Sequence, residues 1–170
     1  MIMFLKIFRI AAIVFLILWM VLIFLLSAET SGESSQTSGV FIEKVISIVI
    51  SGFNELDEIE REETVASFQH IVRKSAHFTI YGILGFLSFL SFISYIKLSF
   101  KVRVVISSAV CLFYAVFDEI HQLFVSGRSG EVRDVCIDFS GAISAILICI
   151  LIVLLNTRLK SILIKTEKTV

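Results

Sequence analysis

Ionisable and amide side chains are concentrated in one stretch of the chain, residues 117–142, between two long apolar runs. The stretch contains Asp118, Glu119, His121, Gln122, Arg128, Glu131, Arg133, Asp134 and Asp138. Carboxylates beside a histidine could transfer protons, and arginines could bind phosphate or carboxylate groups. An ionisable group costs about 2.5–3.5 kcal/mol at the centre of a membrane helix, and less towards its ends. So many of them beside apolar segments predict partners or a functional site.

The flanking apolar runs indicate that lipid is the solvent of this chain. Its 170 residues are 57% hydrophobic, without a proline, and have a mean hydropathy of +0.96. Four segments reach the roughly 20 residues that a membrane span needs, over about residues 7–28, 73–96, 104–125 and 132–155. We therefore predict an all-α, integral membrane four-helix bundle. The first segment resembles a secretory signal, but its length and the three later spans favour an uncleaved anchor over residues 1–28.

The basic residues predict the orientation of the spans. Those in short flanks on one side are Lys6, Arg9, Lys97, Lys101, Arg103, Arg158, Lys160, Lys165 and Lys168. Short cytoplasmic flanks carry an excess of Lys and Arg, so this side is expected to be cytoplasmic. Every acidic residue except Glu167 falls on the other side or in the outer halves of the spans. The expected topology is N-in/C-in, with residues 156–170 as a cytoplasmic basic tail.

Residues 29–72 are expected to lie outside the cytoplasm. The segment 27–39 is rich in Ser, Thr and Gly and predicts a flexible linker. Residues 40–53 place apolar side chains at helical spacing, which is typical of an interfacial helix on the outer leaflet. The alternative is a lid or re-entrant element over a site. The charged run 55–63 is interpreted as a solvated helix face rather than a recognition site.

Three of the spans carry polar stripes at a common depth in the outer half of the membrane. The stripes consist of Lys74, His77 and Tyr81 in the second span, Asp118 and Gln122 in the third, and Asp134 and Asp138 in the fourth. Spacings of three, four and seven residues place side chains on one helix face. Small residues follow the stripes at Gly82, Gly85, Gly141 and Ala142 and predict close helix packing. We expect the stripes to face one another and to form a polar pocket open to the extracytoplasmic side.

The segment SGRSG, residues 126–130, joins the third and fourth spans. Its two glycines allow a tight turn whose amides could bind an anion, with Arg128 as a charged clamp. The alternative is a plain turn that needs positive φ, with Arg128 solvated or near lipid headgroups. Arg73 and Arg133 on adjacent rims favour binding of an anionic group.

Two signatures in this region are similar to those of the VanZ family of bacterial membrane proteins. The first, K-x-x-H-x-x-x-Y, corresponds to Lys74, His77 and Tyr81. The second, D-E-x-x-Q followed by R-S/T, Asp and Gly, corresponds to Asp118, Glu119, Gln122, Arg128, Ser129, Asp134 and Gly141. The signatures cover about a third of the chain, within a three-span core over residues 73–155, and the position of Asp138 is often Asn in the family. The resemblance implies a multi-pass protein of the bacterial cytoplasmic membrane, in a family named for resistance to glycopeptides, particularly teicoplanin.

The leading functional hypothesis is binding of an amphiphilic envelope component in the outward pocket. A lipid-linked glycan, a lipid headgroup or a lipoglycopeptide would fit. The candidate binding residues are Arg73, Lys74, Tyr81, Gln122, Arg128, Arg133, Asp134 and Asp138. Membrane lipids are the expected partners, with no role for nucleic acid.

The alternative is an integral membrane hydrolase or transferase that acts on an envelope lipid. Its catalytic candidates are Asp118 or Glu119 as general base and His77 as acid or nucleophile, with Arg128 or Lys74 stabilising negative charge. Their spacing does not support a metal site, and no cofactor is expected. A third interpretation is structural, with buried ion pairs such as Lys74–Asp118 and Arg133–Asp138 that fix the packing. Proton-coupled transport is disfavoured because the stripes stop halfway through the membrane.

Overall fold

The computed structural model describes residues 2–93, 95 and 97–167, and these form helices without any strand. The elements are α1 (Ile2–Ser27), α2 (Ser31–Val49), the short 3-10 helix η1 (Phe53–Glu55), α3 (Glu58–Ile93), α4 (Phe100–Gln122) and α5 (Val132–Glu167). Four of them, α1, α3, α4 and α5, are long and apolar enough to cross a membrane. The predictions of an all-α chain and of four helices able to span a membrane are confirmed for the described residues.

Two of the spanning helices are longer than the sequence pattern indicated. At 1.5 Å per residue, the 36 residues of α3 and of α5 each extend about 54 Å, well beyond a hydrocarbon core of about 30 Å. Helix α3 begins fifteen residues before the predicted position 73, because Asp57 Oδ1 accepts a hydrogen bond from Glu60 N at 2.8 Å and caps it there. Of the charged run 55–63, residues 58–63 form the first turn and a half of α3 and are mostly exposed, as predicted, whereas Glu55 belongs to η1.

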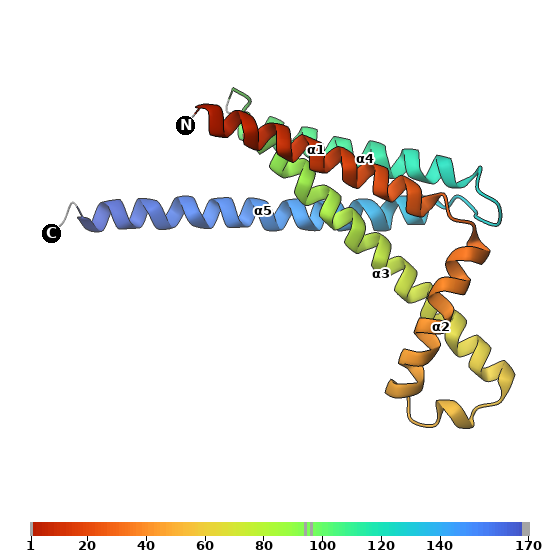
Figure 1. Ribbon diagram of the computed structural model, residues 1–170. Helices are drawn as coiled ribbons and strands as arrows, with labels where there is room; N and C mark the ends of the chain where they lie inside the picture. The colour runs from red at the N-terminus through yellow and green to blue at the C-terminus, as the bar shows by residue number, and fades with distance from the viewer. Residues whose placement is uncertain (1, 94, 96, 168–170) are drawn as a thin grey trace.

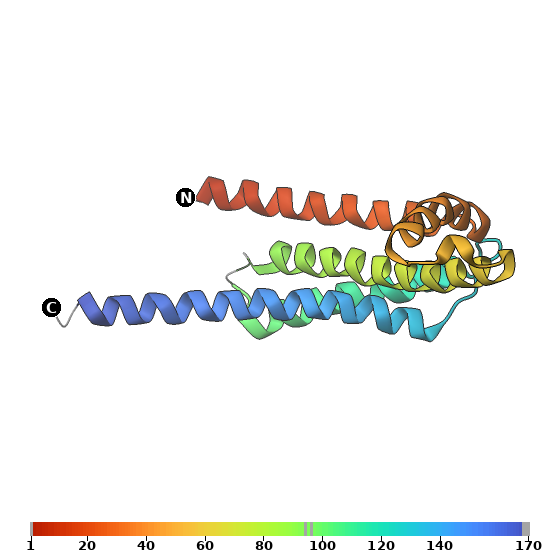
Figure 2. The same cartoon turned by 90° about the horizontal axis from the view of Figure 1, so that it is seen from below.

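The start of α1 and the end of α5 lie at the same end of the bundle (Figures 1 and 2). Helix α2, η1 and the loop 123–131 lie at the opposite end. This arrangement is what an even number of spans requires, and it places the predicted functional loop and the predicted outer segment together.

Close packing of α3 on α5 brings the polar residues of the two helices together. A Cβ built on Gly141 would meet backbone atoms of Phe78, and one built on Gly85 would meet backbone atoms of Ala142. Only glycine permits such an approach, so the predicted packing role of these small residues is confirmed. Helix α1 joins the bundle through Trp19, whose Nε1 donates to Ile80 O at 3.0 Å.

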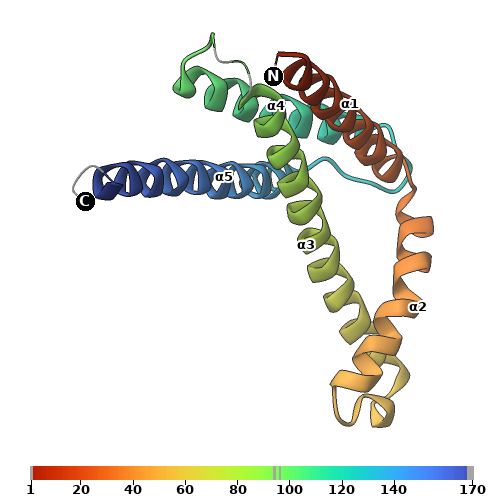
Figure 3. The same ribbon diagram turned by 60° about the vertical axis from the view of Figure 1, so that its left-hand side comes forward.

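Helix α2 packs against the protruding first half of α3 (Figure 3). Ile42 and Ile46 form a small buried cluster with Phe53, and Val65 of α3 packs against it. The opposite face of α2 leaves Ile48 77% exposed. Helix α2 therefore forms one arm of a helical hairpin with the first half of α3 and keeps an exposed apolar face.

The prediction of a flexible linker over residues 27–39 is wrong from Ser31 onward, because α2 begins there. Ser, Thr and Gly each cost at most about 1 kcal/mol relative to alanine in a helix, which tertiary contacts readily offset. One such contact lies at Gly39, where an added Cβ would be 2.7 Å from Gln69 Nε2 of α3.

Candidate functional site

The polar stripe of α3 contacts both neighbouring helices, turn by turn. Lys74 Nζ forms an ion pair with Asp134, and His77 Nδ1 lies 3.2 Å from Asp138 Oδ1. One turn further on, Tyr81 OH donates to Asp118 Oδ2 of α4 at 3.0 Å. The predicted convergence of the three stripes is therefore confirmed.

The partners differ from the ion pairs expected from sequence. The expected Lys74–Asp118 and Arg133–Asp138 pairs are wrong, since Lys74 pairs with Asp134 and Asp138 pairs with His77. The side chain of Arg133 is exposed. The physical reason is the close crossing of α3 and α5. It places Lys74 and His77 beside residues of α5 at the same depth, whereas Tyr81 contacts α4.

Two carboxylates of the cluster are almost completely buried. Asp118 and Asp138 are each 1% exposed. Asp118 Oδ2 accepts from Tyr81 and lies 3.5 Å from Gln122 Nε2, whereas Asp118 Oδ1 and Asp138 Oδ2 have no hydrogen-bond partner among the described residues. A buried polar atom without a partner is costly, so each of these oxygens needs a donor, from a water molecule or a bound group, or has a functional role.

The loop 123–131 carries Arg128 over the cluster. Gly127 adopts φ 76°, so this part of the expected turn does require positive φ. Arg128 Nε donates to Glu29 O at 2.9 Å, and Nη1 donates to Gln122 Oε1 at 3.4 Å. Burial, and then the neighbouring Arg73 guanidinium, lower the pKa of Arg128 from its ordinary value. Two guanidinium groups held near each other favour an anion between them.

Glu119 anchors the end of the same loop. Its carboxylate accepts a hydrogen bond from the backbone N–H of Glu131, just before α5 begins. The Glu119 side chain is buried and does not line the cavity described next. Its position fits a role in holding the loop in place.

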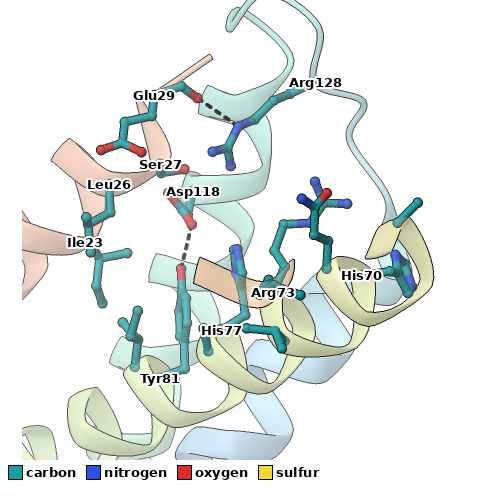
Figure 4. Close-up of a pocket in the computed structure, with 16 residues that line it drawn as sticks. Ile23, Leu26, Ser27, Glu29, His70, Arg73, His77, Tyr81, Asp118 and Arg128 are labelled. Atoms are coloured by element: carbon teal, nitrogen blue, oxygen red, sulfur yellow. Dashed lines mark hydrogen bonds between the residues drawn. The ribbon is translucent and has the colours of Figure 1, made fainter. Parts of the chain in front are cut away.

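A cavity of about 400 Å³ opens beside this cluster, between α1, α2 and α3 (Figure 4). Its apolar wall includes Ile23 and Leu26 of α1, Ile42 of α2, and Val72 and Ile80 of α3. Its polar residues are Ser27, Glu29, Gln69, His70, Arg73, His77, Tyr81, Asp118 and Arg128. The cavity thus has an apolar side and a charged side, and it is in the size range of small-molecule sites.

Five of the candidate residues predicted from the sequence line the cavity, together with residues that were not predicted. Those predicted residues that line it are Arg73, His77, Tyr81, Asp118 and Arg128. Those that lie outside its lining are Lys74, Glu119, Gln122, Arg133, Asp134 and Asp138. Ser27, Glu29, Gln69 and His70 were not predicted. Gln69 and His70 continue the polar stripe of α3 by one turn before Arg73. A helix predicted to begin before residue 73 would have placed both on the same face as the stripe.

The four spans and the polar cluster define a multi-pass helical membrane protein. The model of the VanZ/LLP1 family matches residues 12–154, and the chain belongs to that family. The match begins within α1, so the family region includes the helices that contribute the apolar wall as well as the two signatures. No curated protein and no solved structure matches the chain significantly.

Proposed function

We propose that this VanZ-family protein binds an amphiphilic component of the bacterial cell envelope in the cavity between α1, α2 and α3. The observation that carries the proposal is the composition of the cavity. Its apolar wall on α1 and α2 suits an acyl or prenyl chain, and Arg73 and Arg128 suit a phosphate or carboxylate. A water-soluble ligand would not need the apolar wall. In a purely structural cluster, Arg73 and Arg128 would each be paired with a carboxylate instead of lining a cavity.

The proposed orientation is N-in/C-in in the cytoplasmic membrane, with the cavity open to the outer side. The basic residues at the ends of α1 and α5 support it, because positive flanks remain in the cytoplasm. In this orientation the exposed apolar face of α2, with Val45, Ile48 and Val49, rests on the outer leaflet.

The ligand classes that fit are a lipid-linked glycan, a phospholipid headgroup and a lipoglycopeptide. All three combine an apolar chain with a polar group that carries negative charge. Binding of a lipoglycopeptide such as teicoplanin, or of its envelope target, would connect this cavity to glycopeptide resistance.

A lipid census of the protein in native nanodiscs tests the proposal. The wild type is compared with Arg128→Gln, which removes one cation of the clamp, and with Lys44→Gln, which removes an exposed cation on α2 outside the cavity. We expect one class of anionic amphiphile to be enriched with the wild type and with Lys44→Gln, and lost with Arg128→Gln. Identical lipid profiles for all three proteins would contradict the proposal.

The His77–Asp138 pair favours a second candidate function, an envelope-lipid hydrolase or transferase. When an ionised Asp138 accepts from Nδ1, the Nε2 atom of His77 is left as a proton acceptor, and His77 lines the cavity beside Asp118. A bound amphiphile that is chemically altered by the wild type but recovered intact from His77→Gln would establish the enzyme. Recovery of the same intact amphiphile from both proteins would leave binding as the function.

A further inference from the structure

Asp118 contributes to the cavity a charge opposite to that of Arg73 and Arg128. It is 1% exposed and lines the cavity, where Tyr81 OH and Gln122 Nε2 approach its Oδ2 atom (Figure 4). Its Oδ1 atom has no hydrogen-bond partner in the described part of the chain. A buried carboxylate oxygen needs a donor, and an ionised one is best matched by a cation.

The cations nearest in the cluster do not fill this position. Lys74 pairs with Asp134, and His77 directs Nδ1 to Asp138. Among the described residues Arg128 forms no ion pair with Asp118; both groups bond to Gln122, whose Oε1 accepts from Arg128 and whose amide nitrogen approaches Asp118. The amide holds the positive and negative groups apart, so both remain open to a ligand.

Ser27 provides a second unsatisfied group on the same cavity. Its side chain is 4% exposed, and its Oγ atom lacks a hydrogen-bond partner among the described residues. A primary ammonium carries three donors and a positive charge, so it can bind a carboxylate oxygen and a hydroxyl at once, whereas an amide or a hydroxyl is neutral.

Building on the proposed function, we infer that the bound headgroup carries a protonated amine beside its anion. The ammonium group binds Asp118 Oδ1 and Ser27 Oγ, and the phosphate or carboxylate lies between Arg73 and Arg128. Two envelope sources share this chemistry: aminoalkyl phospholipids, and lipid-linked glycans whose peptide has a free amine. A headgroup with an anion alone leaves the Asp118 carboxylate unmatched.

The test measures binding to the full chain in detergent by native mass spectrometry. The probes are phosphatidylethanolamine, its N-acetyl derivative and phosphatidylglycerol, and a second arm uses a lipid-linked disaccharide peptide with its amine free or acetylated. The proteins are the wild type, Asp118→Asn, Arg128→Gln and, as a charge-matched control at an exposed position, Glu43→Gln. The probe series, phospholipid or lipid-linked glycan, whose free-amine form binds more tightly identifies the source of the headgroup.

We expect the wild type and Glu43→Gln to bind the free amine at least about tenfold more tightly than its acetylated form, the size of one charge-assisted hydrogen bond. Asp118→Asn should lose this preference, and Arg128→Gln should weaken binding of every probe. Equal binding of amine and acetylated forms by the wild type, weakened for both by Arg128→Gln, would overturn this inference and retain the proposed function. Binding of all probes unaffected by Arg128→Gln would overturn both. The acetylation comparison uses wild-type protein, so it stands even where Asp118→Asn does not fold.

Discussion

Replacing Gly141 with alanine should separate α3 from α5 at the level of the His77–Asp138 pair. The added Cβ would overlap the carbonyl oxygen of Phe78 and lie 2.9 Å from its carbonyl carbon, whereas ordinary contacts begin at 3.4 Å. The helices must therefore part by more than about 0.5 Å, which lengthens the 3.2 Å His77–Asp138 contact to more than about 3.7 Å, beyond hydrogen-bond distance. Overpacking costs about 1–3 kcal/mol and the lost charged hydrogen bond about 1.5–3 kcal/mol, less about 1 kcal/mol gained in helix propensity. We expect a net loss of about 1.5–5 kcal/mol in the free energy of unfolding.

The matched control is Gly82→Ala on the facing helix. Its Cβ would lie 3.6 Å from Gly141 O, an ordinary contact, so the variant should be as stable as the wild type or up to about 1 kcal/mol more stable. Unfolding in mixed micelles can be followed through Trp19, the single tryptophan of the chain, which contacts α3 through Ile80 O. Equal free energies of unfolding for Gly141→Ala and Gly82→Ala would refute the packing argument.

Three further predictions concern the ion pair, the helix cap and the topology. Lys74→Ala and Asp134→Ala should each lower the free energy of unfolding by about 3–5 kcal/mol, with the double variant less affected than the sum; additive losses would show that the pair is not coupled. Ser99→Ala removes the cap of α4, where Oγ accepts from an amide at 3.3 Å, and should cost about 1 kcal/mol in the same titration; no change would exclude capping there. In a cysteine-free background, Ser129→Cys should be labelled from outside intact cells and Lys160→Cys should not; the reverse pattern would invert the proposed orientation.

The sequence was sufficient to predict the spans and the facing polar stripes, because both depend on local periodicity. It could not assign the partners within the cluster. Whether Lys74 meets Asp118 or Asp134 depends on how closely α3 and α5 approach, and that approach is set by Gly141 against the Phe78 backbone. Such a contact joins residues more than sixty positions apart and leaves no pattern in a single sequence.

The part of the cavity that residues 23–42 form could not be predicted from the sequence either. Ile23 and Leu26 lie in an apolar run in which the sequence does not distinguish one side of the helix from another. Only the packing of α1 shows which residues form the cavity wall and which are exposed. The first turns of α2 were assigned to a linker because Ser, Thr and Gly are weak helix formers. Its contact with α3 near Gln69 overrides that preference.

A photo-crosslinking comparison of Leu26 with Leu25 tests the central claim most directly. The two are neighbours on α1, but Leu26 lines the cavity, whereas Leu25 lies outside it and is 60% exposed. With a diazirine amino acid at each position in cells, we predict that position 26 crosslinks a selected anionic amphiphile, lost with Arg128→Gln, while position 25 crosslinks the bulk membrane lipids. The same bulk lipids at both positions, unchanged by Arg128→Gln, would contradict a ligand-binding cavity.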